Sequence, residues 1–193
     1  MTQDELLAAF EAAWSSEGFL SCDHEQQRLT QGQDVLRRFF AQQQHAPESP
    51  TLIEEKFSVP LDDFLVTGRI DRVDIQGTEA VIIDYKSADV DDQAEANRRV
   101  KTSIQMAVYT LAWATMHGQP PKRVELRFLE TGVVGQHAFS EEDLERTKDH
   151  LRNVARFIRA GDFHPTPQER ACRWCAYQTI CPSAFSPFPT PSS

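Results

Sequence analysis

An acidic and a basic side chain stand two positions apart at the end of an apolar run in the first half of the chain. Residues 80–83 read Ala-Val-Ile-Ile, a β-branched run that predicts a buried strand, and Asp84 and Lys86 follow it. Side chains alternate along a strand, so Asp84 and Lys86 project to the same side. The carboxylate can hold a divalent metal ion, and the lysine can stabilise an attacking hydroxide and a phosphate. This is chemistry suited to phosphodiester hydrolysis.

Further polar residues occur at intervals that can bring them to this strand end. Asp71 lies in the preceding predicted strand, and Gln105 and Tyr109 lie four positions apart, hence on one face of a following predicted helix. Mg²⁺ suits two carboxylates because it takes oxygen ligands and keeps several waters. The alternatives are ion-paired or solvated carboxylates at a strand edge, and an ordinary polar helix face with Tyr109 at the margin of the core.

Three segments together resemble the RecB/AddB-type branch of the PD-(D/E)xK nuclease superfamily, which is related to the CRISPR-adaptation exonucleases. They are Gly68–Asp74 (Gly-Arg-Ile-Asp-Arg-Val-Asp), Ile83–Ser87 (Ile-Asp-Tyr-Lys-Ser) and Gln105–Tyr109 (Gln-Met-Ala-Val-Tyr). The resemblance covers residues 50–183, with the segments in the family's order. It implies an α/β fold of the restriction-endonuclease type, with a mixed sheet flanked by helices, and hydrolysis of DNA with Mg²⁺ or Mn²⁺.

The resemblance also implies roles for individual residues. Metal binding is implied for the two aspartates, catalysis for the lysine, and a supporting role near the phosphate for the glutamine and tyrosine: Asp71, Asp84, Lys86, Gln105 and Tyr109. Glu54 matches an acidic position that commonly precedes the first segment and is a further candidate metal ligand. Family members usually carry a histidine on an earlier helix. His24 and His45 are the early histidines here, and neither lies in the family's sequence pattern.

Three of the four cysteines fall within ten residues, as Cys172-x2-Cys175-x5-Cys181. In a protein expected to be cytoplasmic, such clustering predicts metal binding rather than disulfides. The resemblance implies a [4Fe–4S] cluster with a fourth cysteine upstream of the nuclease core, and Cys22 is the remaining cysteine. The alternatives are Zn²⁺, held with Cys22 or a histidine such as His164, and free structural thiols.

The charge of the chain argues against tight, independent binding to DNA. Its formal net charge is −9, whereas stand-alone DNA-binding proteins are usually basic because phosphate neutralisation dominates their affinity. A nuclease supplied with DNA by a partner is compatible with this charge, and the resemblance implies a helicase or a recombination-complex subunit as that partner. The basic residues that could line a DNA path, or be solvated surface, are Arg98, Arg99, Lys101, Lys122 and Arg123.

At 193 residues the chain is long enough for one domain with appendages. We expect an N-terminal helical region over residues 1–46, a nuclease core over 50–160, a Cys-cluster segment over 161–183 and a disordered tail over 184–193. No apolar run approaches the roughly 18–20 residues of a membrane span. The acidic N-terminus lacks the basic start and apolar stretch of a signal peptide. We therefore expect a cytoplasmic protein without a membrane partner.

Hydrophobic periodicity predicts the elements that must position these residues. The predicted strands cover about residues 51–59, 65–75, 79–86, 122–130 and 133–139. The predicted helices cover about residues 3–14, 23–44, 93–117 and 140–160. In the helix over 93–117, the residues expected to face the core are Ile104, Val108, Leu111 and Ala112. This order of elements fits a mixed sheet flanked by helices.

Two functions remain open from the sequence. One is a divalent-metal-dependent DNA exonuclease acting in recombination, repair or adaptation, working with a helicase. The other is a catalytically weak or inactive DNA-binding or docking module of a helicase–nuclease complex. The Asp84-x-Lys86 pair and the Gln105 and Tyr109 pair favour the enzyme, and the acidic charge favours the module.

Overall fold

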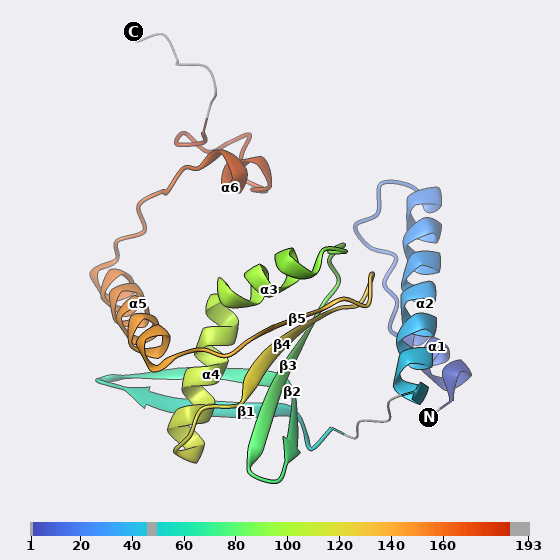
Figure 1. Cartoon of the computed structure of the whole chain (residues 1–193). Coiled ribbons are helices and arrows are strands. Elements are labelled where there is room, and N and C mark those ends of the chain that lie inside the picture. The colour runs from blue at the N-terminus through green and yellow to red at the C-terminus, as the bar shows by residue number, and fades with distance from the viewer. Residues whose placement is uncertain (1, 46–49, 186–193) are drawn as a thin grey trace, which may run out of the picture. The chain divides into compact units, whose positions relative to one another are not determined.

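The computed structural model describes residues 2–45 and 50–185 (Figure 1). The chain divides into two compact units, Met1–Asp149 and His150–Ser193. The first unit contains a five-stranded sheet with its helices, and the second contains the cysteine-rich segment. The tail expected over 184–193 lies outside the described residues from position 186 onward.

Two helices open the chain, as the sequence predicts: α1 (Gln3–Ala12) and α2 (Cys22–His45). Thr2 and Glu5 start α1 with a reciprocal capping box, which satisfies two of the backbone N–H groups at its first turn. Trp14 Nε1 donates a hydrogen bond to Glu25 Oε1 at 3.1 Å, and the Trp14 ring packs edge-on against Phe10. These contacts hold α1 against the first half of α2.

A mixed sheet follows, with the strands in the order in which they occur in the chain. They are β1 (Leu52–Leu61), β2 (Phe64–Gln76), β3 (Glu79–Lys86), β4 (Arg123–Phe128) and β5 (Val134–His137). Strands β3 and β4 pair in parallel, and the other neighbours pair antiparallel. A parallel pair needs a long crossover, which the helices between β3 and β4 supply. The predicted α/β fold with a mixed sheet is confirmed.

The crossover consists of two helices, α3 (Gln93–Lys101) and α4 (Ile104–His117). The prediction of one continuous helix over 93–117 was therefore wrong. Ser103 has an extended backbone, and its hydroxyl accepts a hydrogen bond from Met106 N at 3.3 Å. Thr102 closes α3 by donating its hydroxyl to Arg98 O. Serine favours a helix cap because its side chain competes with the backbone for hydrogen bonds. The chain therefore restarts the helix at Ser103.

Helix α4 covers one face of the sheet, and half of its fourteen residues are buried. Leu111 and Ala112 are buried, as predicted, and Val108 packs partly against the core. Ile104 was also expected in the core, but it is 48% exposed. The break at Ser103 makes Ile104 the first residue of α4, and the helix begins to bury side chains only from Met106 onward.

The last helices are α5 (Glu141–Ala160) and α6 (Glu169–Arg173). Ser140 caps α5 as expected: its hydroxyl accepts from Asp143 N and donates to the Asp143 carboxylate. The short α6 falls in a region where no helix was predicted. None of the helices in the described part of the chain is long and apolar enough to cross a membrane.

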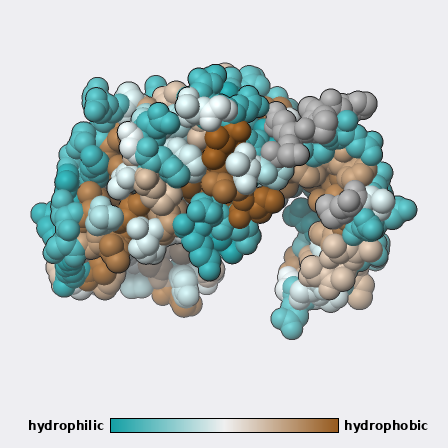
Figure 2. All heavy atoms as spheres, turned by 90° about the horizontal axis from the view of Figure 1, so that it is seen from below, coloured by the Kyte–Doolittle hydropathy of each residue, from teal (hydrophilic) through white to brown (hydrophobic). Residues whose placement is uncertain are grey.

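Apolar side chains also appear on the surface. In Figure 2, hydrophobic side chains gather in several places among hydrophilic ones. Single exposed apolar residues are ordinary on folded proteins, so exposure by itself does not mark a functional site. A surface residue needs a second reason, such as its position beside reactive groups, before a function follows.

Candidate active site

Three acidic residues align across neighbouring strands. Strands β2 and β3 pair Arg72 with Ile83, and the same register continued by one position sets Asp71 opposite Asp84. Strands β1 and β2 pair residues on both sides of Glu54, and that register sets Glu54 opposite Asp71. The register therefore aligns three acidic positions that lie far apart in the sequence, and the contacts of each side chain decide which carboxylates can share an ion.

Asp84 is the buried member of this row. It is only 1% exposed, because it follows the buried apolar residues of strand β3. Burial raises the pKa of Asp84, the Lys86 ammonium opposes that rise, and the nearby Asp71 carboxylate adds to it. Two neighbouring carboxylates, one of them desolvated, repel each other when both are ionised. A bound cation would relieve this repulsion.

Lys86 lies beside Asp84 on the same side of β3. Its Nζ is 2.6 Å from Asp84 Oδ2, while its side chain remains 39% exposed. The contact is an ion pair without hydrogen-bond alignment, since the buried Oδ2 accepts no aligned hydrogen bond from the described residues. An acceptor atom that is buried and has unused lone pairs fits a metal ligand.

Helix α4 joins this pair through a directed chain of hydrogen bonds. Lys86 Nζ donates to Gln105 Oε1 at 2.9 Å, and Gln105 Nε2 donates to the Tyr109 hydroxyl at 2.8 Å. The four-residue spacing of Gln105 and Tyr109 places both on the face of α4 that meets the end of β3. The structure thus brings together Asp84, Lys86, Gln105 and Tyr109, as the sequence predicts.

Tyr109 is buried, and its surroundings favour the protonated hydroxyl. Its ring is buried and packs edge-on against Phe57 of β1, with the centroids 6.0 Å apart. Burial raises the pKa of the Tyr109 hydroxyl; the Gln105 hydrogen bond opposes that rise, and the Asp84 and Asp71 charges add to it. Since Gln105 occupies an acceptor position on the phenolic oxygen, the hydroxyl hydrogen is available to donate to another group.

Glu54 differs from the other two carboxylates. It is exposed, and its Oε2 accepts a hydrogen bond from Arg69 Nη1 at 3.0 Å. Its backbone is left-handed, with φ of 53°, a conformation that costs a residue with a side chain roughly 1–3 kcal/mol. Within residues 2–45 and 50–185, no three His, Cys, Asp or Glu side chains form a group that could hold a metal ion. The described donors in this region are therefore two carboxylates, Asp71 and Asp84.

The opposite face of β2 and β3 carries a network that the sequence analysis missed. Arg72 is buried and donates two hydrogen bonds of 2.7 Å to Asp74 and one of 3.1 Å to the Tyr85 hydroxyl. Burial works against the charge of Arg72, but these partners raise its pKa. The Tyr85 ring packs edge-on against Phe39 of α2. The signal was present in the alternation of charged residues at Arg72 and Asp74 within a predicted strand.

The four cysteines form no disulfide in the described structure. Cys22 starts α2 in the first unit, and the other three belong to the second unit. Backbone hydrogen bonds of successive turns shape the segment that carries these three cysteines; for example, Cys175 N donates to Cys172 O. The Cys172 sulfur itself accepts a hydrogen bond from Phe185 N, with Sγ at 3.3 Å. Backbone N–H groups that donate to sulfur are compatible with a thiolate ligand.

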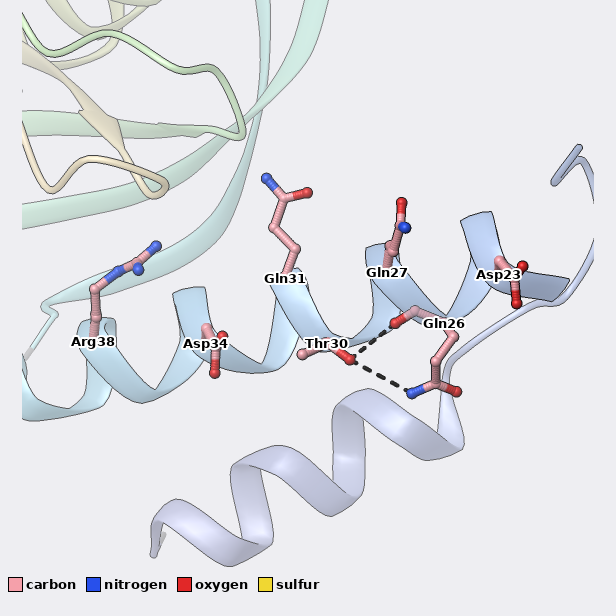
Figure 3. A pocket seen from close by; sticks show the side chains of 7 residues that line it. All are labelled: Asp23, Gln26, Gln27, Thr30, Gln31, Asp34 and Arg38. Carbon is pink, nitrogen blue, oxygen red and sulfur yellow. Dashed lines mark hydrogen bonds between the residues drawn. The ribbon is translucent and has the colours of Figure 1, made fainter. Parts of the chain in front are cut away.

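A groove runs along α2 (Figure 3). Its lining residues all belong to that helix: Asp23, Gln26, Gln27, Thr30, Gln31, Asp34 and Arg38. The Thr30 hydroxyl donates a hydrogen bond to the Gln26 backbone oxygen and accepts one from Gln26 Nε2. No candidate catalytic residue lines the groove. His24, the early histidine, accepts a long contact of 3.5 Å from Leu20 N and packs against Phe19, so its described contacts are local.

Comparisons with known proteins identify the family of the chain. Residues 1–182 match the PD-(D/E)XK nuclease superfamily. The Gene 69 protein of Mycobacterium phage L5 is 27% identical over 136 residues, which make up 67% of this chain and 44% of the phage protein. The chain thus spans less than half the length of that relative.

A solved structure shares the fold. It is the crystal structure of a candidate exonuclease from Eubacterium rectale, with a TM-score of 0.52 and 14% sequence identity, covering 96% of this chain and 71% of that one. At this identity the likeness concerns the fold alone. The family match covers nearly the whole chain. The acidic residues that align across the strands and the lysine at the end of β3 fit that family. The chain belongs to the PD-(D/E)XK nuclease superfamily.

Proposed function

We propose that this protein is a divalent-metal-dependent DNA exonuclease that acts in DNA recombination or repair. The observation that carries the proposal is the buried Asp84 carboxylate, with Asp71 beside it and with an oxygen that accepts no aligned hydrogen bond. This donor set suits Mg²⁺ or Mn²⁺, which prefer oxygen ligands and keep several waters. Asp71 and Asp84 would hold the ion, and Glu54 could join them by releasing Arg69.

The metal, when bound, would lower the pKa of a water and polarise the phosphate. The chain's own side chains have separate tasks. Lys86 stabilises negative charge that develops on the attacking oxygen and the phosphate, and Gln105 keeps its ammonium at the end of β3. Tyr109, with its hydroxyl hydrogen available, donates to a phosphate oxygen. These groups are ordered before substrate arrives, so little reorganisation is needed during the reaction.

We also propose that the protein works with a helicase or another subunit of a recombination complex. The net charge of −9 is unfavourable for independent capture of DNA, so a partner that grips the DNA would supply the affinity that this chain lacks. The phage relative is longer than this chain, which leaves room in that protein for further segments.

The cysteine segment is proposed to bind a [4Fe–4S] cluster through Cys172, Cys175 and Cys181, with Cys22 as the fourth ligand. Thiolates suit such a cluster, and Zn²⁺ is the competing ion. The support is the spacing of the three cysteines and the N–H donor at Cys172 Sγ. A bound cluster would order the segment that surrounds α6.

One observation favours the weaker or inactive module as the second candidate. Glu54, which could complete a set of three carboxylates, is engaged by Arg69. A site with two carboxylates binds metal more weakly than one with three, so catalysis could need a partner or a high metal concentration.

Cleavage of an end-labelled DNA strand tests the choice between these functions. Purified full-length protein is incubated with the DNA in Mn²⁺, in Mg²⁺ and in EDTA, with Lys86→Ala as the matched control. We expect the wild type to shorten the strand stepwise with either metal and to be inert in EDTA. Absence of cleavage at millimolar Mn²⁺, with DNA binding retained, would favour the inactive module.

A further inference from the structure

The turn between α3 and α4 lies directly beside the proposed catalytic centre. Ser103 caps α4, and Gln105, two residues later, holds the Lys86 ammonium at 2.9 Å. A side chain that leaves this turn is therefore close in the chain to the group that would act on the phosphate. Two residues of the turn, Lys101 and Ile104, have no role in the contacts described so far.

Ile104 is unusual for its place in the sequence. It is 48% exposed, whereas Met106 and Ala107, which follow in the same helical turn, are buried. Exposed apolar residues are common, but this one is adjacent in the chain to Gln105, which holds the proposed catalytic lysine. Isoleucine is among the apolar side chains that proteins insert against or between bases.

Lys101 provides a charge at the other side of Ser103. The other four basic residues that the sequence offered for a DNA path are engaged by carboxylates: Arg98 and Arg99 by Glu95, Lys122 by Glu79, and Arg123 by Glu125. Lys101 is exposed and forms no ion pair with any residue that the structure describes. Its ammonium is therefore available to a phosphate.

We propose that the α3–α4 turn binds the nucleotide next to the scissile phosphate, with Lys101 at a backbone phosphate and Ile104 against a base. The proposal rests on the proposed nuclease function. A nucleotide offers an anionic phosphate and an apolar base face at neighbouring positions, and the turn offers a free cation and an exposed apolar side chain three residues apart. Binding at this turn would fix the register of the strand relative to Lys86.

Two measurements test these two contacts. The first is the affinity of the full chain for fluorescein-labelled oligothymidylate in Ca²⁺, measured by anisotropy over a range of salt concentrations. Lys101→Gln should weaken binding and reduce the slope of log K against log salt by about 0.7, the value for one phosphate of a single strand. Ile104→Ala should weaken binding about five- to tenfold, as loss of a base contact does, and leave the slope unchanged.

The second measurement is the kinetics of cleavage in Mn²⁺. Both variants should raise KM and leave kcat close to wild type, because neither side chain touches the groups that carry the chemistry. The matched controls are Lys56→Gln, an exposed lysine of β1, and Met116→Ala, an exposed residue in the last turn of α4. We expect both controls to behave like wild type.

The outcomes distinguish this inference from the proposed function. If the wild type cleaves DNA but Lys101→Gln and Ile104→Ala match it in KM and affinity, the turn does not bind the nucleotide and the nuclease function stands. Equal effects of the test variants and the controls would also overturn the inference, since the losses would then be nonspecific. If the wild type cleaves no DNA even at millimolar Mn²⁺, the nuclease function fails and the inference, which rests on it, fails with it.

Discussion

The Lys86 ammonium lies 2.6 Å from a carboxylate oxygen of Asp84, although the Lys86 side chain is more than a third exposed. One partner of this ion pair is inside the protein, and the other reaches the surface at the end of β3. The lysine can thus face a substrate phosphate while it stays paired with Asp84. The two residues can therefore be changed separately, with different expected losses.

Replacement of Lys86 by alanine should affect the rate and spare DNA binding. Loss of one preorganised group that stabilises charge in the transition state lowers kcat by about 10²- to 10³-fold. DNA affinity should change little, because a single ammonium supplies a small part of it. Single-turnover cleavage in Mg²⁺ measures the rate, and anisotropy measures the affinity. Cleavage at the wild-type rate would show that Lys86 is not the catalytic lysine.

Asp84→Asn should abolish activity and yet stabilise the metal-free protein. Burial raises the pKa of Asp84, so at neutral pH the folded state holds an ionised group that it disfavours, and a neutral side chain of the same shape removes that cost. The melting temperature should rise, by about 2–4 °C for each kcal/mol gained in a domain of this size. Mn²⁺ should raise the melting temperature of the wild type but not that of the variant. A variant that Mn²⁺ stabilises as strongly as wild type would exclude Asp84 as a metal ligand.

Gln105 and Tyr109 should act as one unit with Lys86. Gln105→Leu removes the acceptor for Lys86 and the donor to Tyr109, whereas Tyr109→Phe keeps the ring contact with Phe57 and removes only the hydroxyl. Each change should lower kcat about 10- to 100-fold with little change in KM, the value of a hydrogen bond to a charged group. The double variant should lose little more than Gln105→Leu alone. If the loss of kcat in the double variant equals the product of the two single losses, Gln105 and Tyr109 act independently.

The cap of α5 offers a test of stability against pH. Ser140, through its hydroxyl and backbone N–H, and then Arg146, hold the pKa of Asp143 well below its usual range. A carboxylate with a lowered folded pKa stabilises the protein above the unfolded pKa of about 3.9, and this contribution is lost as the pH falls through the folded value. Asp143→Asn should therefore melt below wild type at pH 7, and the gap should narrow below about pH 4. Glu142→Gln, an exposed neighbour, is the control and should show no such pattern.

Much of the fold followed from local signals. The apolar run before Asp84 predicts β3 because β-branched residues pack well in a strand, and Ser140 predicts the start of α5 because its hydroxyl caps the helix. Register across strands was not predictable in the same way. The alignment of Glu54, Asp71 and Asp84 depends on pairing between strands, which the periodicity of one strand does not determine.

The sequence predictions that were wrong also have physical causes. Ser103 lies in a sequence with continuous helical periodicity, and its cap divides the helix because a side-chain hydrogen bond outweighs that pattern locally. Ile104 then becomes the first residue of a new helix instead of an interior core residue. Buried charges such as Arg72 are also hard to predict, since a charged residue reads as surface unless its partners, here Asp74 and Tyr85, are known.

The cysteine segment should depend on a bound metal for its order. Its helix α6 has five residues, and the large apolar side chains around it, Trp174, Tyr177 and Ile180, are mostly exposed. So little buried apolar surface cannot offset the chain entropy of ordering the segment. Metal binding and local folding should therefore be coupled. Protein purified without oxygen should be brown, and Cys175→Ser should remove the colour and make the region after Gly161 sensitive to protease.

Cys22→Ser then decides the fourth ligand of the cluster. Loss of colour with retained α2 helicity would make Cys22 a ligand, and an unchanged cluster would leave the fourth position to another group. Colourless protein with stoichiometric zinc, lost in Cys175→Ser, would replace the iron–sulfur cluster by Zn²⁺ and keep the ordering role of the metal. A third outcome would reject both forms of the proposal: the protein contains no metal, and its segment after Gly161 is as protease-resistant as the first unit. The order of the segment would then come from contacts other than thiolate ligation.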